Sequence, residues 1–149
     1  MVFSPELIRR LYSFREAEFG QGATPQEIEL AEEQLGVEFP ESYKALLEQF
    51  GWASIDGLEL YGLGRDVPAH LALVKVTLSE RTEMRPRLPS HLVPLMNDGA
   101  GNHYCLDVES CGQGECRVVF WDHDLGESQN PEYVAPNLEV WLSEELNTL

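Results

Sequence analysis

The chain has 149 residues, 43% of them hydrophobic, which is typical of one globular domain with a single core. Its formal net charge is −16, from 26 acidic and 10 basic residues, and this argues against direct binding to nucleic acid, because proteins hold phosphates with Lys and Arg. No apolar stretch approaches the roughly 20 residues of a membrane-spanning helix, and the N-terminal segment MVFSPELIRR lacks the zones of a signal peptide, so we expect a soluble cytoplasmic protein with no membrane partner.

Three helices are predicted in the first third of the chain. The first begins with a serine and a proline, and its apolar residues share one face over residues 4–11. Thr24 and Glu27 form a capping box for the second helix, which ends at Gly36. The third is predicted within residues 39–51, where apolar side chains recur three, four and seven positions apart.

The pattern then changes. Residues 57–62 alternate apolar and polar side chains between glycines, which is typical of a half-buried strand. Residues 68–81 have helical spacing together with the Val and Thr content of a strand, and we favour a helix. A proline-containing connector follows at residues 85–89, and a closing helix is predicted from Asn137 onward.

The clearest local pattern is the run LMNDGAGNHYCLD, from Leu95 to Asp107. Two apolar stretches flank a turn of Gly, Asn and Asp, the residue types that tolerate a left-handed backbone. The run therefore predicts a β-hairpin, with strands at 93–96 and 104–107. A further strand is predicted at 117–122.

Together these elements predict an α+β fold for residues 1–149, treated as a single domain. It should contain N-terminal helices, an antiparallel β-sheet of about four to six strands and a C-terminal helix. No repeat or linker divides the chain. Residues 109–115 and 125–136 are predicted to be acidic surface loops.

Negative charge is concentrated in two segments. Residues 16–59 contain eleven acidic residues against one lysine, and residues 98–149 contain eleven against one arginine. Residues 65–87, in contrast, have a net charge of +2. Such acidity can serve solubility alone, or it can attract a basic protein partner.

The three cysteines, Cys105, Cys111 and Cys116, are separated by five and four residues. This spacing fits neither a CxxC redox pair nor a zinc knuckle, and we interpret all three as reduced thiols. Cys105 is expected in the core. Cys111 and Cys116 lie in a Gly-rich loop and would pair only in an oxidising setting.

No motif for catalysis stands out. The sequence has no GxSxG elbow, Walker loop or HExxH, and no dinucleotide fingerprint in the right context. His103 and Cys105 would share a strand face, but the sequence offers no third residue that would orient them for catalysis. Asp98 and Asp107 would suit a carboxylate pair, yet aspartates at turns and strand ends are common for conformational reasons. We therefore expect that the protein is not an enzyme and that it binds no cofactor.

The best case for a metal site is Asp122-His123-Asp124, joined by Asp98, Asp107 and His103. Neighbouring strand residues point to opposite faces, so the triplet would need a bend to converge, and we expect no metal. The tryptophans are assigned to core or interface packing rather than to cofactor stacking: Trp52, Trp121 and Trp141.

Five segments in this order resemble the SMI1/KNR4 family of the SUKH superfamily: EEQLGVEFPESYKALLEQFG, LELYGLG, LVPLMNDGAGNHYCLD, VVFWDHD and LEVWLSEEL. The likeness extends from Thr24 to Leu146. The matched positions are interpreted as structural: Gly36, Pro40, Gly51, Asn97, Asp98, Gly99, Gly101, Asn102, Asp107, Trp121 and Trp141.

The resemblance implies an α+β fold. For bacterial members it also implies a non-catalytic immunity protein that binds and neutralises a toxin domain, often a nuclease, of a contact-dependent or other polymorphic toxin system. Fungal members resemble regulatory scaffolds in cell-wall signalling, and an intracellular scaffold is therefore the alternative. The resemblance leaves the toxin and the oligomeric state open.

The net negative charge and the family resemblance together lead to one hypothesis. A nuclease must be basic to hold its substrate, so an acidic protein can cover that surface. We predict an acidic face for a basic toxin domain, with two tyrosines as exposed anchors. The candidate contact residues are Asp56, Glu59, Tyr61, Asp122, Asp124, Glu127, Glu132 and Tyr133.

Overall fold

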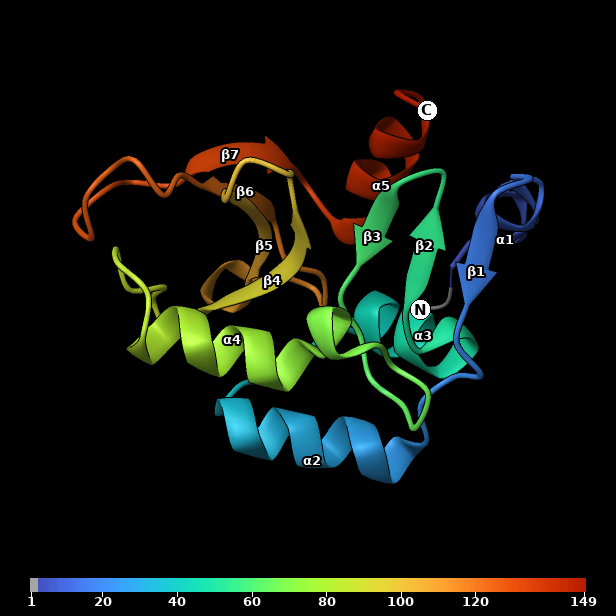
Figure 1. The fold of residues 1–149 in the computed structure, drawn as a ribbon, viewed down its shortest axis with the longest axis horizontal. Helices are drawn as coiled ribbons and strands as arrows, with labels where there is room; N and C mark the ends of the chain where they lie inside the picture. Colours follow the sequence, from blue (N-terminus) through green and yellow to red (C-terminus); the bar gives the residue numbers. More distant parts are fainter. Residues whose placement is uncertain (1–2) are drawn as a thin grey trace.

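The structure is a computed structural model that describes residues 3–149, and it shows the α+β class that the sequence predicts. The helices are α1 (Pro5–Tyr12), α2 (Pro25–Leu35), α3 (Glu41–Phe50), α4 (Leu73–Thr82) and α5 (Leu138–Leu146), with short 3₁₀ turns η1 (Ala69–Leu71) and η2 (Val108–Ser110). The strands are β1 (Ala17–Phe19), β2 (Ala53–Ile55), β3 (Leu58–Leu60), β4 (Leu92–Asn97), β5 (His103–Asp107), β6 (Val118–Trp121) and β7 (Glu132–Ala135) (Figure 1).

The helix ends follow their sequence signals. The Thr24 side chain accepts a hydrogen bond from the Glu27 backbone N–H at 3.1 Å, and the Glu27 carboxylate accepts one from the Thr24 N–H at 2.9 Å. This is the predicted capping box of α2, and Gly36 ends the helix with a left-handed φ of 68°. Only the second part of segment 68–81 is α-helical, because α4 begins at Leu73, after the 3₁₀ turn η1.

The strands divide between two antiparallel sheets rather than one, in the orders β1-β2-β3 and β4-β5-β6-β7. The hairpin predicted between Leu95 and Asp107 is confirmed as β4–β5. The prediction of a loop over residues 125–136 was wrong in part, because β7 lies within it and pairs with β6. Strands β1, β2 and β7 are only three or four residues long, too short for an alternating pattern to stand out.

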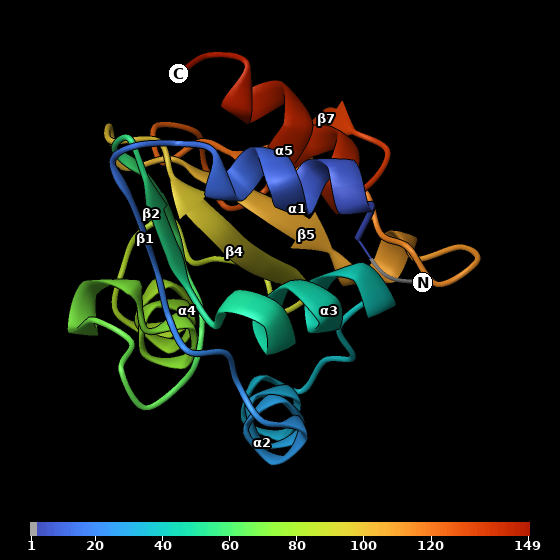
Figure 2. The same cartoon turned by 90° about the vertical axis from the view of Figure 1, so that its right-hand side faces the viewer.

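One hydrophobic core includes residues from both sheets and from each of these five helices. Figure 2 shows α1 and α5 side by side above strands β4 and β5, with α3 below these strands in the view and α2 beyond it; α3 also packs against α5. The Arg10 guanidinium holds α1 against α5 by donating to the backbone carbonyl of Ser143 and the side chain of Asn147. Trp52, Trp121 and Trp141 are all buried, as expected.

A second, smaller cluster packs under the connector that precedes β4. It consists of Leu88, Leu92, Cys105, Val119 and Trp121. Cys105 is thus a core residue, as predicted. Within residues 3–149, no helix has the length and apolar character needed to cross a membrane.

The interpretation of Cys111 and Cys116 as reduced thiols was wrong, because the structure joins them in a disulfide. Gln113 and Gly114 both have positive φ, and they turn the chain so tightly that the two Cα atoms lie 4.1 Å apart. The spacing of the cysteines does not reveal this turn. Next to the disulfide, the Glu115 carboxylate accepts hydrogen bonds from the backbone N–H and the hydroxyl of Ser42 in the first turn of α3.

Gly62, just after β3, lies where several elements meet. Its N–H donates to Leu71 of η1 and its carbonyl accepts from Leu73 of α4, both at 2.9 Å. A Cβ at this position would lie 1.7 Å from the carbonyl oxygen of Gly51. No side chain fits in that space, so only glycine allows this approach of the two backbones.

We expect Gly62→Ala to lower the free energy of unfolding by about 3 kcal/mol, the upper part of the range for overpacked sites. Gly126→Ala is the matched control, since a Cβ there would meet open space, and it should change stability by less than about 0.5 kcal/mol. Urea unfolding followed by circular dichroism measures both. Equal stability of the two variants would contradict the steric argument.

Candidate functional site: an acidic groove between the hairpin tips

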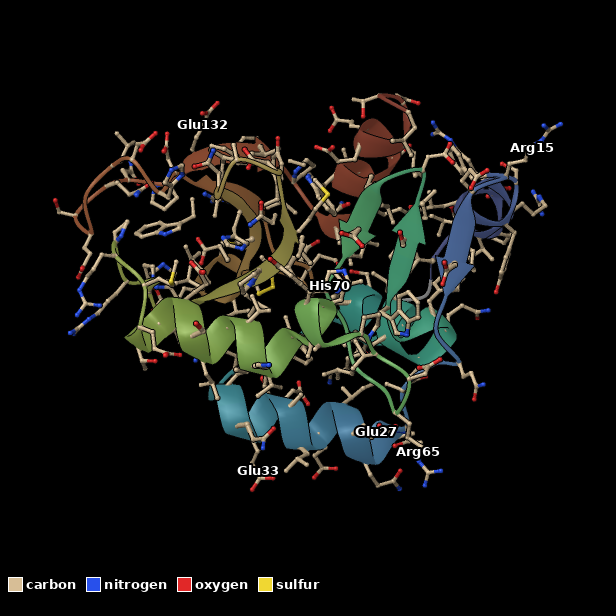
Figure 3. The ribbon with its side chains drawn as sticks, in the orientation of Figure 1. Arg15, Glu27, Glu33, Arg65, His70 and Glu132 are labelled. Atoms are coloured by element: carbon tan, nitrogen blue, oxygen red, sulfur yellow. A yellow bond between two sulfur atoms is a disulfide. The ribbon has the colours of Figure 1, made fainter. Side chains whose placement is uncertain are left out.

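A groove of about 560 Å³ opens between the β2–β3 turn, the β4–β5 turn and the C-terminal end of α5. Four carboxylates line it, and no Lys or Arg is among the described residues of its wall. The carboxylates are those of Asp56, Glu59, Asp98 and Glu145. Figure 3 places His70 at η1, below β3, and its Nε2 lies 3.0 Å from Oε2 of Glu59.

Asp56 lies at the tip of the β2–β3 hairpin for a conformational reason. Asp56 and Gly57 have φ values of 48° and 89°, and they form a two-residue turn that joins the pair Ile55 and Leu58. An Asp-Gly pair with two positive φ angles is typical of a tight hairpin turn. The Asp56 side chain is exposed, so the turn presents its carboxylate at the rim of the groove.

The β4–β5 turn is held by its own side chains. The Asp98 carboxylate accepts hydrogen bonds from the backbone N–H groups of Ala100 and Asn102 and from the Asn102 side chain, and the Asn97 side chain accepts from Gly99. Burial opposes the charge of Asp98, but these hydrogen bonds outweigh it and hold the pKa of Asp98 below its ordinary value. Asp98 therefore remains charged in a fixed position.

The turn after β6 is tied to the same hairpin. Oδ1 of Asn102 accepts hydrogen bonds from the backbone N–H of His123 at 3.0 Å and from its ring Nδ1 at 2.7 Å. The ring also packs on Gly101, where a Cβ would come within 3.3 Å of it. Asp122 and Asp124 therefore extend the acidic surface beyond Asp98.

This turn corrects the expectation that Asp122, His123 and Asp124 point apart. The residues follow β6 in a turn rather than lying within a strand, and one ligand atom of each lies within 4.8 Å of the others. Their contacts are those of a turn: Asp122 accepts from the backbone N–H of Asp124 at 2.8 Å, and the His123 ring bonds to Asn102. We assign the triplet to the turn.

The two predicted tyrosine anchors differ. Tyr133 is 55% exposed on β7, whereas Tyr61 is only 7% exposed and cannot be an exposed anchor. Tyr61 instead forms part of the groove wall, and its hydroxyl is hydrogen-bonded to Nε2 of His103 at 2.9 Å. Alternation in the strand pattern could not predict this, because the residue lies just after β3, where the backbone joins β4.

The structure brings together only part of the predicted contact set. Asp56, Glu59 and Tyr61 line the groove with Asp98, and Asp122 and Asp124 lie beside that turn. Glu127, Glu132 and Tyr133 lie in the β6–β7 loop and on β7, outside the groove wall. Figure 3 shows Glu132 on β7, apart from His70.

A second cavity, of about 480 Å³, adjoins the groove and shares Tyr61, His70 and Asn97 with it. It is lined by Lys75 and Glu80 of α4 and by His103 of β5, with Nδ1 of His103 3.9 Å from Oε1 of Glu80. Burial lowers the pKa of His103 to about 4 and raises the pKa of Glu80. His103 is therefore neutral at pH 7.

His103 and Cys105 do not form a nucleophile and base. The Cys105 thiol points to the backbone carbonyl of His103 at 3.8 Å, not to the imidazole, and burial strongly raises the pKa of the thiol. A thiol in such surroundings stays protonated and unreactive. Asp98 and Asp107 do not pair either, since each is hydrogen-bonded within its own turn.

A family model of the SUKH group, described as SMI1-KNR4 cell-wall, matches residues 6–147. The chain belongs to this family. In this SMI1-KNR4 protein, the positions of the family pattern lie at turns, helix ends and buried sites. Gly36 and Gly51 end helices with positive φ, Pro40 precedes α3, the Asp107 carboxylate accepts from the Glu109 N–H, and Trp141 packs against Tyr104.

In this SMI1-KNR4 protein, three residues of the site were not predicted from the sequence: Glu80, His70 and Glu145. Glu80 has a signal: Leu73, Thr77 and Glu80 are spaced as one inward face of α4, and an acid on such a face is unusual. Glu145 has no comparable signal, because only the tertiary fold brings the end of α5 to the hairpin tips.

We expect the imidazole of His103 to titrate near pH 4 instead of near its ordinary value of 6.5. In the unfolded chain the ring takes up a proton near pH 6.5, so its contribution to stability is complete above that pH and is lost as the pH falls toward 4. This loss is on the order of 3 kcal/mol. Proton NMR of the ring follows the titration directly.

His103→Gln removes this group and keeps a polar partner for Tyr61. The difference in unfolding free energy between the wild type and this variant should therefore shrink between pH 6.5 and pH 4. A His103 ring that titrates near pH 6.5 in the folded protein would show that it is not desolvated.

Proposed function

We propose that this protein is a non-catalytic immunity protein that binds and neutralises a basic toxin domain, such as a nuclease, through the acidic groove and the adjoining turns. The observation that supports it most is the groove wall, which combines four carboxylates with no Lys or Arg among its described residues. Membership of the SMI1-KNR4 family is consistent with this role.

The electrostatics suit a basic partner. The carboxylates lie in a concave surface, where low-dielectric walls concentrate their field and speed the approach of a positively charged protein. A basic partner also offers Lys and Arg side chains, which are absent from the described residues of the groove wall. Binding of this kind should be fast and sensitive to salt.

The surface is also rigid before binding. Asp56 lies in a two-residue turn, Asp98 accepts three hydrogen bonds from its own turn, and Asn102 holds the neighbouring turn in place. Groups that are fixed in advance lose little conformational entropy on binding. This arrangement favours a dedicated binding surface over acidity that serves solubility alone.

The alternative is an intracellular scaffold without a toxin partner. The two roles differ in what happens when the protein is absent. An immunity protein is needed for survival beside toxin-producing kin, whereas loss of a scaffold leaves cells no more sensitive to their kin.

We expect a deletion strain of the producing organism to be killed in mixed culture with its parent, and the wild-type protein to restore survival. Asp56→Lys with Glu59→Lys should fail to restore it, because two attractions in the groove become repulsions. The matched control is Glu29→Lys with Glu33→Lys on α2, which makes the same charge change away from the groove and should still protect.

Competitive survival counts measure this, and far-ultraviolet circular dichroism checks that both variants fold. Survival of the deletion strain without complementation would overturn the immunity role. Protection lost with the α2 variant but kept with the groove variant would move the binding surface to α2.

A further inference from the structure

Glu80 is a partly buried carboxylate that forms no ion pair with any Lys or Arg in the described part of the chain. It lies on the inward face of α4, its side chain is 18% exposed, and none of the described residues donates a hydrogen bond to it. Burying a charge without a partner is costly, and such a group is retained where a function uses it. Glu80 lines the cavity beside the groove.

The nearby bases do not supply the missing charge. Arg81 donates to the backbone carbonyls of Leu35 and Ser90, both at 2.8 Å, and so is engaged elsewhere. Lys75 also lines the cavity, but its side chain is exposed and forms no ion pair with Glu80. The imidazole of His103 is neutral, since its pKa is about 4.

The second observation is the ring nitrogen Nδ1 of His103, which is buried, faces Glu80 and has no hydrogen-bond partner among residues 3–149. His103 as a residue is only 2% exposed. If Nδ1 were protonated, the N–H would be drawn to the carboxylate at about 2.8 Å. The observed 3.9 Å is beyond hydrogen-bond distance, so no hydrogen bond joins the two groups directly. We infer that the ring proton is on Nε2, which is hydrogen-bonded to the Tyr61 hydroxyl at 2.9 Å, and that Nδ1 is an acceptor.

The geometry points to a receptor for a single cationic side chain: the cavity takes one Lys or Arg of a protein partner, which donates N–H bonds to Glu80 and to Nδ1 of His103. That the partner is the basic toxin domain rests on the function proposed above. The cavity shares Tyr61, His70 and Asn97 with the acidic groove, so a segment that lies in the groove can place one side chain in the cavity.

The rim favours the same ligand. Glu59 and Asp98 lie along the adjoining groove, so a cation approaches through negative potential. A bound cation restores a favourable environment for the Glu80 charge, which burial otherwise opposes. A neutral side chain of the same shape would do neither.

The test uses the full-length protein labelled with ¹⁵N and the probe N-acetyl-L-lysine methylamide. Its uncharged match is N-acetyl-L-norleucine methylamide, which keeps the alkyl chain and lacks the amine. The lysine probe should produce saturable shifts in the amides of Ser79, Glu80 and His103, with millimolar affinity, and the norleucine probe should not.

Glu80→Gln should weaken the lysine probe by about tenfold or more, because a charge-assisted hydrogen bond is replaced by a neutral one. Glu83→Gln, one turn along and exposed, loses the same charge and should bind within about twofold of the wild type. In the wild type, saturation with the probe should lower the pKa of Glu80. ¹³C NMR of the Glu80 carboxyl carbon measures this pKa, and the measurement does not require that the variants fold.

Three outcomes would overturn the proposal: equal shifts with the norleucine probe, equal weakening by the two variants, or a ring proton on Nδ1 in long-range ¹⁵N spectra. The survival assay separates this inference from the proposed function. If Glu80→Gln loses the probe but still protects, the cavity has no part in immunity while that role stands. If the probe binds as expected but the deletion strain survives its kin, the cation site stands and the immunity role fails.

Discussion

Three successive backbone N–H groups, those of Tyr61, Gly62 and Leu63, hold the architecture together, because each donates to a different part of the fold. Tyr61 donates to Leu95 of β4 at 3.0 Å, Gly62 to Leu71 of η1 and Leu63 to the carbonyl of Gly51 at the end of α3. This short segment therefore joins the two sheets and fixes the helices against them. The absence of a Cβ at Gly62 makes that approach sterically allowed.

The same junction explains why the acidic groove and the cavity adjoin each other. Because Tyr61 bonds through its backbone to β4, its side chain is held between the β2–β3 and β4–β5 hairpins and lines both hollows. Its hydroxyl then fixes one ring nitrogen of His103 and leaves the other facing Glu80. The polar chemistry of the site is thus positioned by the backbone contact that unites the sheets.

Elements with strong local signals were predictable from the sequence. The capping box at Thr24 and Glu27 and the hairpin turn from Asn97 to Asn102 depend on residues close in the chain, and the structure contains both. The division into two sheets, the short strand β7 and the disulfide between Cys111 and Cys116 depend on distant pairings or on an unusual turn. Hydrophobic periodicity contains no information about distant pairings or about such a turn.

The site shows the same limit. Asp56 and Glu59 were predicted from charge, which a sequence displays directly, and they line the groove with Asp98. Tyr61 was assigned the wrong kind of surface, because burial after a strand end depends on which strand comes alongside. Glu145 enters the groove only because α5 ends above the hairpin tips.

Charge in this protein has two different physical settings, and only one of them constrains a partner in detail. Acids on α2, such as Glu29 and Glu33, are exposed to water, which screens them and leaves their contribution small and non-directional. Glu80 is removed from water and faces a neutral imidazole, so its interactions are stronger and depend on geometry. A net charge of −16 can attract many basic proteins, whereas a partly buried carboxylate 3.9 Å from a second acceptor selects a partner that places an N–H donor between them.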